Sequence, residues 1–197
     1  MPTWFDTLLR PARARQQRLD LEHEHAHQRK QAIIKDYASR FALPVLVESG
    51  THVGNMVEAV RDGFEDVYSI ELAPALFEQS SARFAGLRNI HLVQGDSGEI
   101  LGEVIAGIER PCLFWLDGHY SAGVTAKGPL ETPVERELAH IAAHSLAHQH
   151  VILIDDARLF TGAGDYPHVR QLDDWASRAG FTSCTIEDDI IRIHRRG

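Results

Sequence analysis

Three carboxylates directly follow two apolar segments of the chain. Asp117 comes after residues 112–116, and Asp155 and Asp156 come after residues 151–154. Both segments are typical of buried strands, and the stretch between them is long enough for one helical crossover between parallel strands. Since the carboxyl ends of parallel strands meet at one sheet edge, we expect these carboxylates to lie close together. The pattern predicts a site for Mg²⁺ or another divalent cation beside a substrate cleft.

The same carboxylates have an alternative interpretation that needs no metal. Each could cap a helix or interact favourably with a helix dipole. Asp155 and Asp156 would repel each other unless a cation or a strong donor neutralises them, and Arg158 could be that donor. Both interpretations stay open at this point.

A candidate general base stands two residues beyond the first of these carboxylates. His119 is the first choice because imidazole titrates near neutrality, and with Asp117 it forms the predicted catalytic pair. Tyr120 and Lys127 are further candidates, and His119 could instead only hydrogen-bond within its loop. We expect residues 160–167, in the loop after Asp156, to form one wall of the site, opposite the loop that follows Asp117.

An earlier turn has the composition of a ligand-binding loop. Glu48 is followed by Gly50 and Gly54, which let the backbone approach a ligand closely, and by Asn55 at the start of a predicted helix. The turn lacks the three glycines of GxGxxG, so a dinucleotide pyrophosphate is not its natural ligand. We expect a different cofactor here.

Two further strand-like segments are followed closely by acidic residues. Glu71 ends residues 67–71, and Asp96, followed by Ser97, comes just after residues 90–93. Such carboxylates can accept hydrogen bonds from ligand hydroxyls, or each could be an acid at a helix N-terminus. The predicted cofactor-binding residues are Glu48, Gly50, Thr51, Gly54, Asn55, Glu71, Asp96, Ser97 and Asp117.

Strand-like and helix-like segments alternate through most of the chain. The predicted strands are residues 45–48, 67–71, 90–93, 112–116 and 151–154, and the predicted helices are residues 55–62, 74–84, 97–108, 133–148 and 168–179. The repeated order predicts an α/β fold with a parallel sheet and helices on both faces. Two final strands, residues 181–186 and 190–194, predict an antiparallel hairpin.

The N-terminal residues form a predicted helical extension, residues 1–42, before a Rossmann-like domain, residues 43–197. We expect one or two helices in the extension. Ile33, Ile34 and Tyr37 belong to an apolar stripe that would dock on the domain.

This order of elements resembles the class I methyltransferase fold, with seven mostly parallel strands and a C-terminal antiparallel hairpin. The E-x-G-x-x-x-G spacing from Glu48 to Gly54 is similar to motif I of S-adenosylmethionine-dependent methyltransferases. The resemblance covers roughly residues 43–194. It implies that Glu71 binds the ribose hydroxyls of S-adenosylmethionine (SAM) and that Asp96 contacts its adenine.

The carboxylates after the fourth and fifth strands resemble the divalent-metal site of certain O-methyltransferases. These are the relatives of catechol O-methyltransferase and the enzymes that modify antibiotic sugars, of the macrocin O-methyltransferase type, and aromatic rings. The resemblance implies that Asp117, Asp155 and Asp156 hold the metal. Catechol-type relatives carry a lysine three residues after the first aspartate, where this chain has Tyr120, so that role does not transfer.

The implied function is SAM-dependent, Mg²⁺-assisted O-methylation of a small polar acceptor such as a sugar, a catechol or a natural-product hydroxyl. A metal ion would lower the pKa of the acceptor oxygen and fix its approach to the methyl group. The alternatives are a metal-independent methyltransferase, a nucleotide-binding enzyme and a non-catalytic cofactor-binding module on the same fold.

Composition narrows the range of partners. The chain has 28 acidic and 20 basic residues and a net charge of -8, which argues against a general binder of nucleic acid or anionic membranes. We expect a small-molecule substrate, and homo-oligomerisation stays open. The two cysteines form no CxxC motif, and no apolar segment is long enough for a signal peptide or membrane span. A reducing cytoplasm is the expected location.

A row of histidines offers a second metal hypothesis. His140, His144 and His148 recur every four residues within the predicted helix 133–148 and would share one face of it. No third ligand type with a suitable spacing accompanies the row, and a polar helix face accounts for it, so we favour that interpretation.

Overall fold

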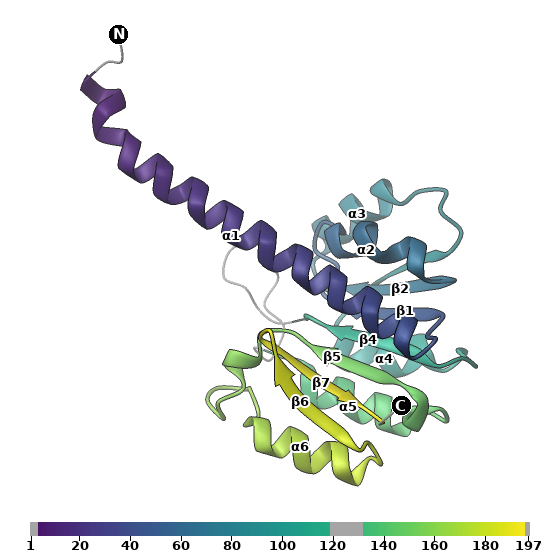
Figure 1. Ribbon diagram of the computed structural model, residues 1–197. Helices are drawn as coiled ribbons and strands as arrows, with labels where there is room; N and C mark the ends of the chain where they lie inside the picture. Colours follow the sequence, from purple (N-terminus) through teal and green to yellow (C-terminus); the bar gives the residue numbers. More distant parts are fainter. Residues whose placement is uncertain (1–3, 119–131, 196–197) are drawn as a thin grey trace. The chain divides into compact units, whose positions relative to one another are not determined.

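A sheet of seven strands forms the centre of the structure. The computed structural model describes residues 4–118 and 132–195. The strands are β1 (Val45–Ser49), β2 (Asp66–Glu71), β3 (Ile90–Gln94), β4 (Cys112–Leu116), β5 (Val151–Ile154), β6 (Ser183–Glu187) and β7 (Ile190–His194). Their order across the sheet is β3-β2-β1-β4-β5-β7-β6 (Figure 1). From β1 the chain continues outward through β2 and β3, and it then crosses to β4 on the other side of β1. Open α/β sheets bind ligands at such a reversal of strand order.

The pairing of the strands confirms the predicted topology. β1 pairs in parallel with β2 and β4, and β2 with β3 and β4 with β5 do the same. β7 runs antiparallel to both β5 and β6. The register sets Ser49 of β1 opposite Leu116 of β4, so the residues that follow these strands emerge side by side. The sheet is therefore mostly parallel and ends in an antiparallel hairpin.

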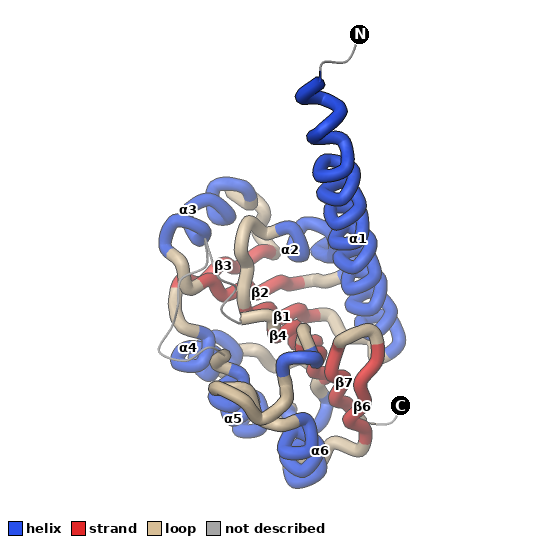
Figure 2. Tube along the Cα trace, turned by 90° about the vertical axis from the view of Figure 1, so that its left-hand side faces the viewer, coloured by secondary structure: helices blue, strands red, loops and turns tan. Residues whose placement is uncertain are grey.

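Helices cover both faces of the sheet. Figure 2 shows α2 (Asn55–Val60) and α3 (Pro74–Arg83) on one side, and α4 (Ser97–Ile105), α5 (Val134–Ala143) and α6 (Val169–Arg178) on the other. Strands covered on both faces need apolar side chains throughout, and every residue of β1, β4 and β5 is buried. Phe114 and Trp115 are the largest fully buried side chains of this core.

The helix before β5 is shorter than predicted, and the histidine row does not share one helical face. α5 ends at Ala143, and His144 has the extended backbone angles φ -69° and ψ 142°. The His140 ring lies 3.0 Å from the carbonyl oxygen of Gly98, whereas His144 Nδ1 lies 2.9 Å from Nε2 of buried His150. His140 and His144 thus have separate contacts, and His148 lies beyond α5 in the 3-10 turn Ala147–Gln149.

The N-terminal residues form one continuous helix, α1 (Trp4–Arg40). The structure divides into two compact units, residues 1–33 and residues 34–197. The division lies within α1, earlier than the predicted boundary after residue 42. In the second unit, Ile34 and Tyr37 are buried, and the Tyr37 ring centroid lies 5.7 Å from that of His194. None of the described helices is long and apolar enough to cross a membrane.

Candidate functional site

The turn after β1 lies against the end of β4. Gly50 has a φ of +88°, and a Cβ atom there would lie 2.5 Å from the backbone oxygen of Asp117. The Asp117 N–H donates a hydrogen bond of 3.1 Å to the carbonyl oxygen of Ser49. Only glycine combines this φ with such close contact at low cost. The structure thus brings the predicted cofactor turn and Asp117 together.

The second glycine of the turn also lacks room for a side chain. Gly54 has a φ of +78° and precedes Asn55, the first residue of α2. A Cβ atom on Gly54 would lie 2.4 Å from the ring of Phe84, which follows α3. The spacing of the two glycines therefore reflects packing on two different neighbours.

A buried carboxylate closes β1. Glu48 is 1% exposed and accepts a hydrogen bond from the Ser69 hydroxyl, which also lies 2.6 Å from the Thr51 hydroxyl. Burial is the main cause that raises the pKa of Glu48 to about 8. The hydrogen bond from Ser69 acts against this shift, and the charges of Asp117 and Glu71 add to it. Three acidic residues that are predicted to bind the cofactor thus lie near one another.

Glu71 organises the backbone of the same turn. Its carboxylate accepts hydrogen bonds from the N–H groups of His52, at 2.7 Å, and Ala73, at 2.8 Å. These two bonds link the end of β2 to the loop after β1. A carboxylate has several acceptor positions, so Glu71 can serve the turn and still accept a bond from a ligand.

Asp96 caps a helix and forms an ion pair. Its Oδ1 accepts a hydrogen bond of 2.9 Å from the Gly98 N–H at the start of α4, and its Oδ2 lies 3.1 Å from Nη2 of Arg136. Ser97, the first residue of α4, is buried. Sequence reasoning missed Arg136, because nothing near it in the chain indicates that α5 packs beside α4.

The carboxylates after β5 have partners of their own. Asp155 Oδ1 accepts a hydrogen bond of 2.8 Å from the Asp156 N–H. Asp156 has a φ of +55°, and its Oδ1 lies 2.8 Å from Nη1 of Arg158, which also pairs with Asp189. Arg158 is therefore the neutralising donor that the sequence offered as the alternative to a metal.

The predicted metal ligands do not form an assembled group among the described residues. Among residues 4–118 and 132–195, no group of three or more histidine, cysteine, aspartate or glutamate side chains could hold one. Asp117, Asp155 and Asp156 follow neighbouring strands without forming such a group. The predicted base His119 and its alternatives Tyr120 and Lys127 lie outside the described residues.

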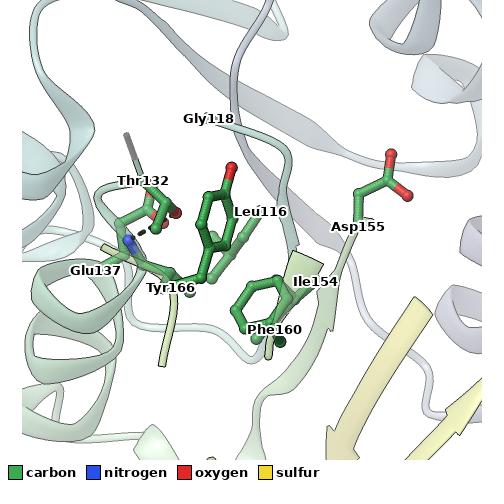
Figure 3. Close-up of a pocket in the computed structure, with 9 residues that line it drawn as sticks. Leu116, Gly118, Thr132, Glu137, Ile154, Asp155, Phe160 and Tyr166 are labelled. Atoms are coloured by element: carbon green, nitrogen blue, oxygen red, sulfur yellow. Dashed lines mark hydrogen bonds between the residues drawn. The ribbon is translucent and has the colours of Figure 1, made fainter. Parts of the chain in front are cut away.

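A pocket opens between the ends of β4 and β5 and the start of α5. It is a depression partly open to solvent. The lining residues are Leu116, Gly118, Thr132, Val134, Glu137, Ile154, Asp155, Phe160 and Tyr166 (Figure 3). Figure 3 shows the Asp155 carboxylate pointing away from the rings of Phe160 and Tyr166. The pocket thus has apolar walls and a few polar groups, as small-molecule sites commonly do.

The loop after β5 supplies the aromatic wall of this pocket. Its two ends meet in an antiparallel bridge between Thr161 and His168, and the Val169 N–H donates to the Phe160 carbonyl oxygen at 3.1 Å. The rings of Phe160 and Tyr166 meet edge to face at 5.4 Å between centroids. These two residues belong to the segment 160–167 that the sequence predicts as a wall of the site.

Glu137 is the lining residue that sequence reasoning missed most clearly. It lies on α5 among Val134, Leu138 and Ile141, all of them buried, and is itself buried. The spacing of these apolar residues places a carboxylate on the buried face of the helix, which is unusual. That signal was present in the sequence and could have identified Glu137.

Solved structures share this fold at low sequence identity. The O-methyltransferase TomG of Streptomyces achromogenes, solved with SAM, has a TM-score of 0.57 and 15% identity, covering 83% of this chain and 78% of its own. A SAM-dependent methyltransferase of Clostridium acetobutylicum has a TM-score of 0.56 and 8% identity, covering 85% of this chain and 91% of its own.

A fungal structure gives the same result. The methyltransferase PaMTH1 of Podospora anserina, bound to S-adenosylhomocysteine (SAH), has a TM-score of 0.53 and 16% identity, covering 85% of this chain and 78% of its own. No protein-family model and no curated protein matches this chain. The strand order, the C-terminal hairpin and these structures together show that the chain has the Rossmann-like fold of class I SAM-dependent methyltransferases.

Proposed function

We propose that this protein is a SAM-dependent O-methyltransferase that acts on a small polar molecule. The observation that carries the proposal is the group of three acidic residues at the ends of β1, β2 and β4, where Glu48, Glu71 and Asp117 lie near one another. SAM has positive charge on its sulfonium and its ammonium group, so these carboxylates complement it. The fold supports the proposal, because its neighbours TomG and PaMTH1 were solved with SAM and SAH.

The proposed reaction is a direct methyl transfer. SAM, when bound, would supply a methyl group attached to a sulfonium sulfur. An acceptor oxygen can attack the methyl carbon in line and displace the sulfur. Glu48 and Glu71 would hold the cofactor through its polar groups, and the pocket between β4, β5 and α5 would orient the acceptor. A bond would form between the acceptor oxygen and the methyl carbon, and the sulfur would keep the electron pair of the broken carbon–sulfur bond. The hydroxyl proton would pass to a base, for which His119 is the candidate predicted from the sequence.

The composition of the pocket and the charge of the chain favour a small acceptor. The pocket combines apolar side chains with a few polar groups, as small-molecule sites commonly do. The net charge of -8 disfavours a nucleic-acid substrate, because phosphate contacts need a basic surface. We therefore propose a small-molecule acceptor with at least one hydroxyl group.

Metal assistance remains a separate prediction. Asp117, Asp155 and Asp156 are the residues that would bind Mg²⁺, and the described residues do not support it, because Asp156 pairs with Arg158 and the three form no ligand group. No step of the proposed reaction therefore passes through a metal.

Cofactor binding tests the proposal first. We expect SAH to bind in a titration calorimeter and to raise the melting temperature. The absence of both heat and a melting shift at millimolar SAH or SAM would refute the proposal. Labelled methyl transfer from SAM to a panel of small hydroxyl compounds should give a product stable to mild base, as an ether is and an ester is not. Unchanged transfer after EDTA treatment would remove the metal from the mechanism.

A further inference from the structure

Glu137 occupies a position that normally excludes a charged group. It is 1% exposed, and its neighbours on the buried face of α5, Val134, Leu138 and Ile141, are at most 2% exposed. Removing a carboxylate from water is costly unless other groups bind it. Packing alone would therefore favour an apolar residue here, which indicates that this carboxylate has a specific partner.

The described part of the protein satisfies only some of the hydrogen-bonding capacity of this carboxylate. The hydroxyls of Ser97 and Ser49 lie near enough to favour the charged form of Glu137, although burial has the larger effect and raises its pKa. Within the described residues, Glu137 Oε1 and Ser49 Oγ make no hydrogen bond of 3.5 Å or less. A buried carboxylate oxygen and a buried hydroxyl thus both have unused hydrogen-bonding capacity in the same place.

This unused capacity lies beside a pocket. Glu137 lines the pocket together with the polar residues Thr132 and Tyr166, and Phe160 contributes an apolar wall (Figure 3). Ser49 directly precedes Gly50 of the cofactor turn. Glu137 therefore lies between the proposed cofactor residues and the proposed acceptor pocket.

We propose that Glu137 is a substrate-binding residue whose Oε1 accepts a hydrogen bond from a hydroxyl of the methyl acceptor. The apolar part of the acceptor packs on Phe160 and Tyr166. The inference rests on the proposed function, since it names the residue that recognises the acceptor. It selects molecules that combine a flat apolar part with a hydrogen-bond donor, because a ligand without a donor would leave the buried carboxylate without a partner.

The test compares two ring compounds that differ in their donors. Catechol has two hydroxyls, and 1,2-dimethoxybenzene has none. In saturation-transfer NMR titrations with SAH-loaded protein, the wild type should bind catechol at least tenfold more tightly than 1,2-dimethoxybenzene. Glu137→Leu should remove this preference, and Glu137→Gln should reduce it. Glu135→Gln, a change at an exposed residue of the same helix, should leave it intact.

The outcomes separate the inference from the proposed function. Equal preference in the wild type and Glu137→Leu, or no binding of catechol to the SAH-loaded wild type, would overturn the inference and leave cofactor binding standing. Failure of the wild type to bind SAH would overturn the proposed function itself. If Glu137→Leu does not fold, Glu137→Gln decides: a lower melting temperature with unchanged catechol preference would show a purely structural role.

Discussion

At the scale of single residues, the acidic groups at the carboxyl ends of the strands have different roles. Glu71 and Asp96 fix loops and a helix start through backbone N–H groups, and Asp156 pairs with Arg158. Glu48 is the exception, because it is buried and its main partner is a neutral hydroxyl. A group of this kind lowers the stability of the ligand-free protein, and such residues cluster at functional sites.

Glu48→Gln should stabilise the ligand-free protein and weaken cofactor binding. The folded pKa of about 8 lies above the ordinary value of 4.5, so the folded state binds more protons between these values. The unfolding free energy of the wild type should therefore fall as pH rises from about 4.5 to about 8. The variant should lack this dependence and gain about 1–3 kcal/mol at pH 7.

Urea denaturation at several pH values, with SAH titration at pH 7, measures both effects. We expect SAH affinity to fall about tenfold, because glutamine cannot ionise when the positively charged ligand binds, whereas Glu48 can. The conservative change Glu58→Gln, at a half-exposed residue of α2, is the control. A variant with the same pH dependence as the wild type would contradict the assigned pKa.

At the scale of elements, the turn after β1 connects three strands. Gly50 donates its N–H to the Ile70 carbonyl oxygen of β2 at 2.9 Å and lies against the backbone of Asp117 after β4. Glu71 at the end of β2 binds the N–H of His52 in the same turn. Any change in the backbone of this turn should therefore reach the cofactor residues on all three strands.

Gly50→Ala should lower both stability and cofactor affinity. An added Cβ atom would meet a backbone oxygen and force an unfavourable φ, at a cost of about 1–3 kcal/mol or more. SAH affinity should fall at least tenfold. Gly63→Ala is the matched control, since no atom lies within 4 Å of its added Cβ atom and its φ is not positive. Melting curves and SAH titration check the pair, and equal effects would refute the packing argument.

The sequence predicted the elements better than their contacts. Residues 112–116 and 151–154 are apolar throughout because both faces of the sheet are covered. The glycines of the turn after β1 were recognisable because the backbone there requires them. The end of α5 has no glycine or proline that would mark it in the sequence. The helix ends at Ala143, and His144 has an extended backbone and contacts buried His150. Arg136 reaches Asp96 only through the packing of α5 on α4, which no local pattern encodes.

At the scale of the whole molecule, the chain consists of two units that divide within one helix. Residues 34–197 contain the sheet, its core and every described residue of the candidate site. Ile34, Tyr37 and Ala38 are buried in this unit, although the sequence suggested a domain starting at residue 43. The end of α1 is therefore a structural part of the unit that carries the site.

Two truncations should separate these parts of α1. Removal of residues 1–33 should leave the unfolding free energy of the remaining unit within about 0.5 kcal/mol and SAH affinity unchanged. Removal of residues 1–42 should cost about 2–5 kcal/mol, because it deletes buried Ile34 and Tyr37. Urea denaturation of the two proteins, with SAH titration, makes the comparison. Equal stability would instead place the start of the domain at residue 43.

The two glycines of the turn differ in how evolution could replace them. The obstacle at Gly54 is the side chain of Phe84, so a smaller residue at position 84 could relieve the steric part of a substitution. The obstacle at Gly50 is the backbone oxygen of Asp117, which every amino acid at position 117 would carry. A change at position 84 can therefore relieve the clash at position 54, where only the cost of the positive φ would remain. Position 50 has no compensating partner among side chains and should stay glycine in any descendant that keeps this fold.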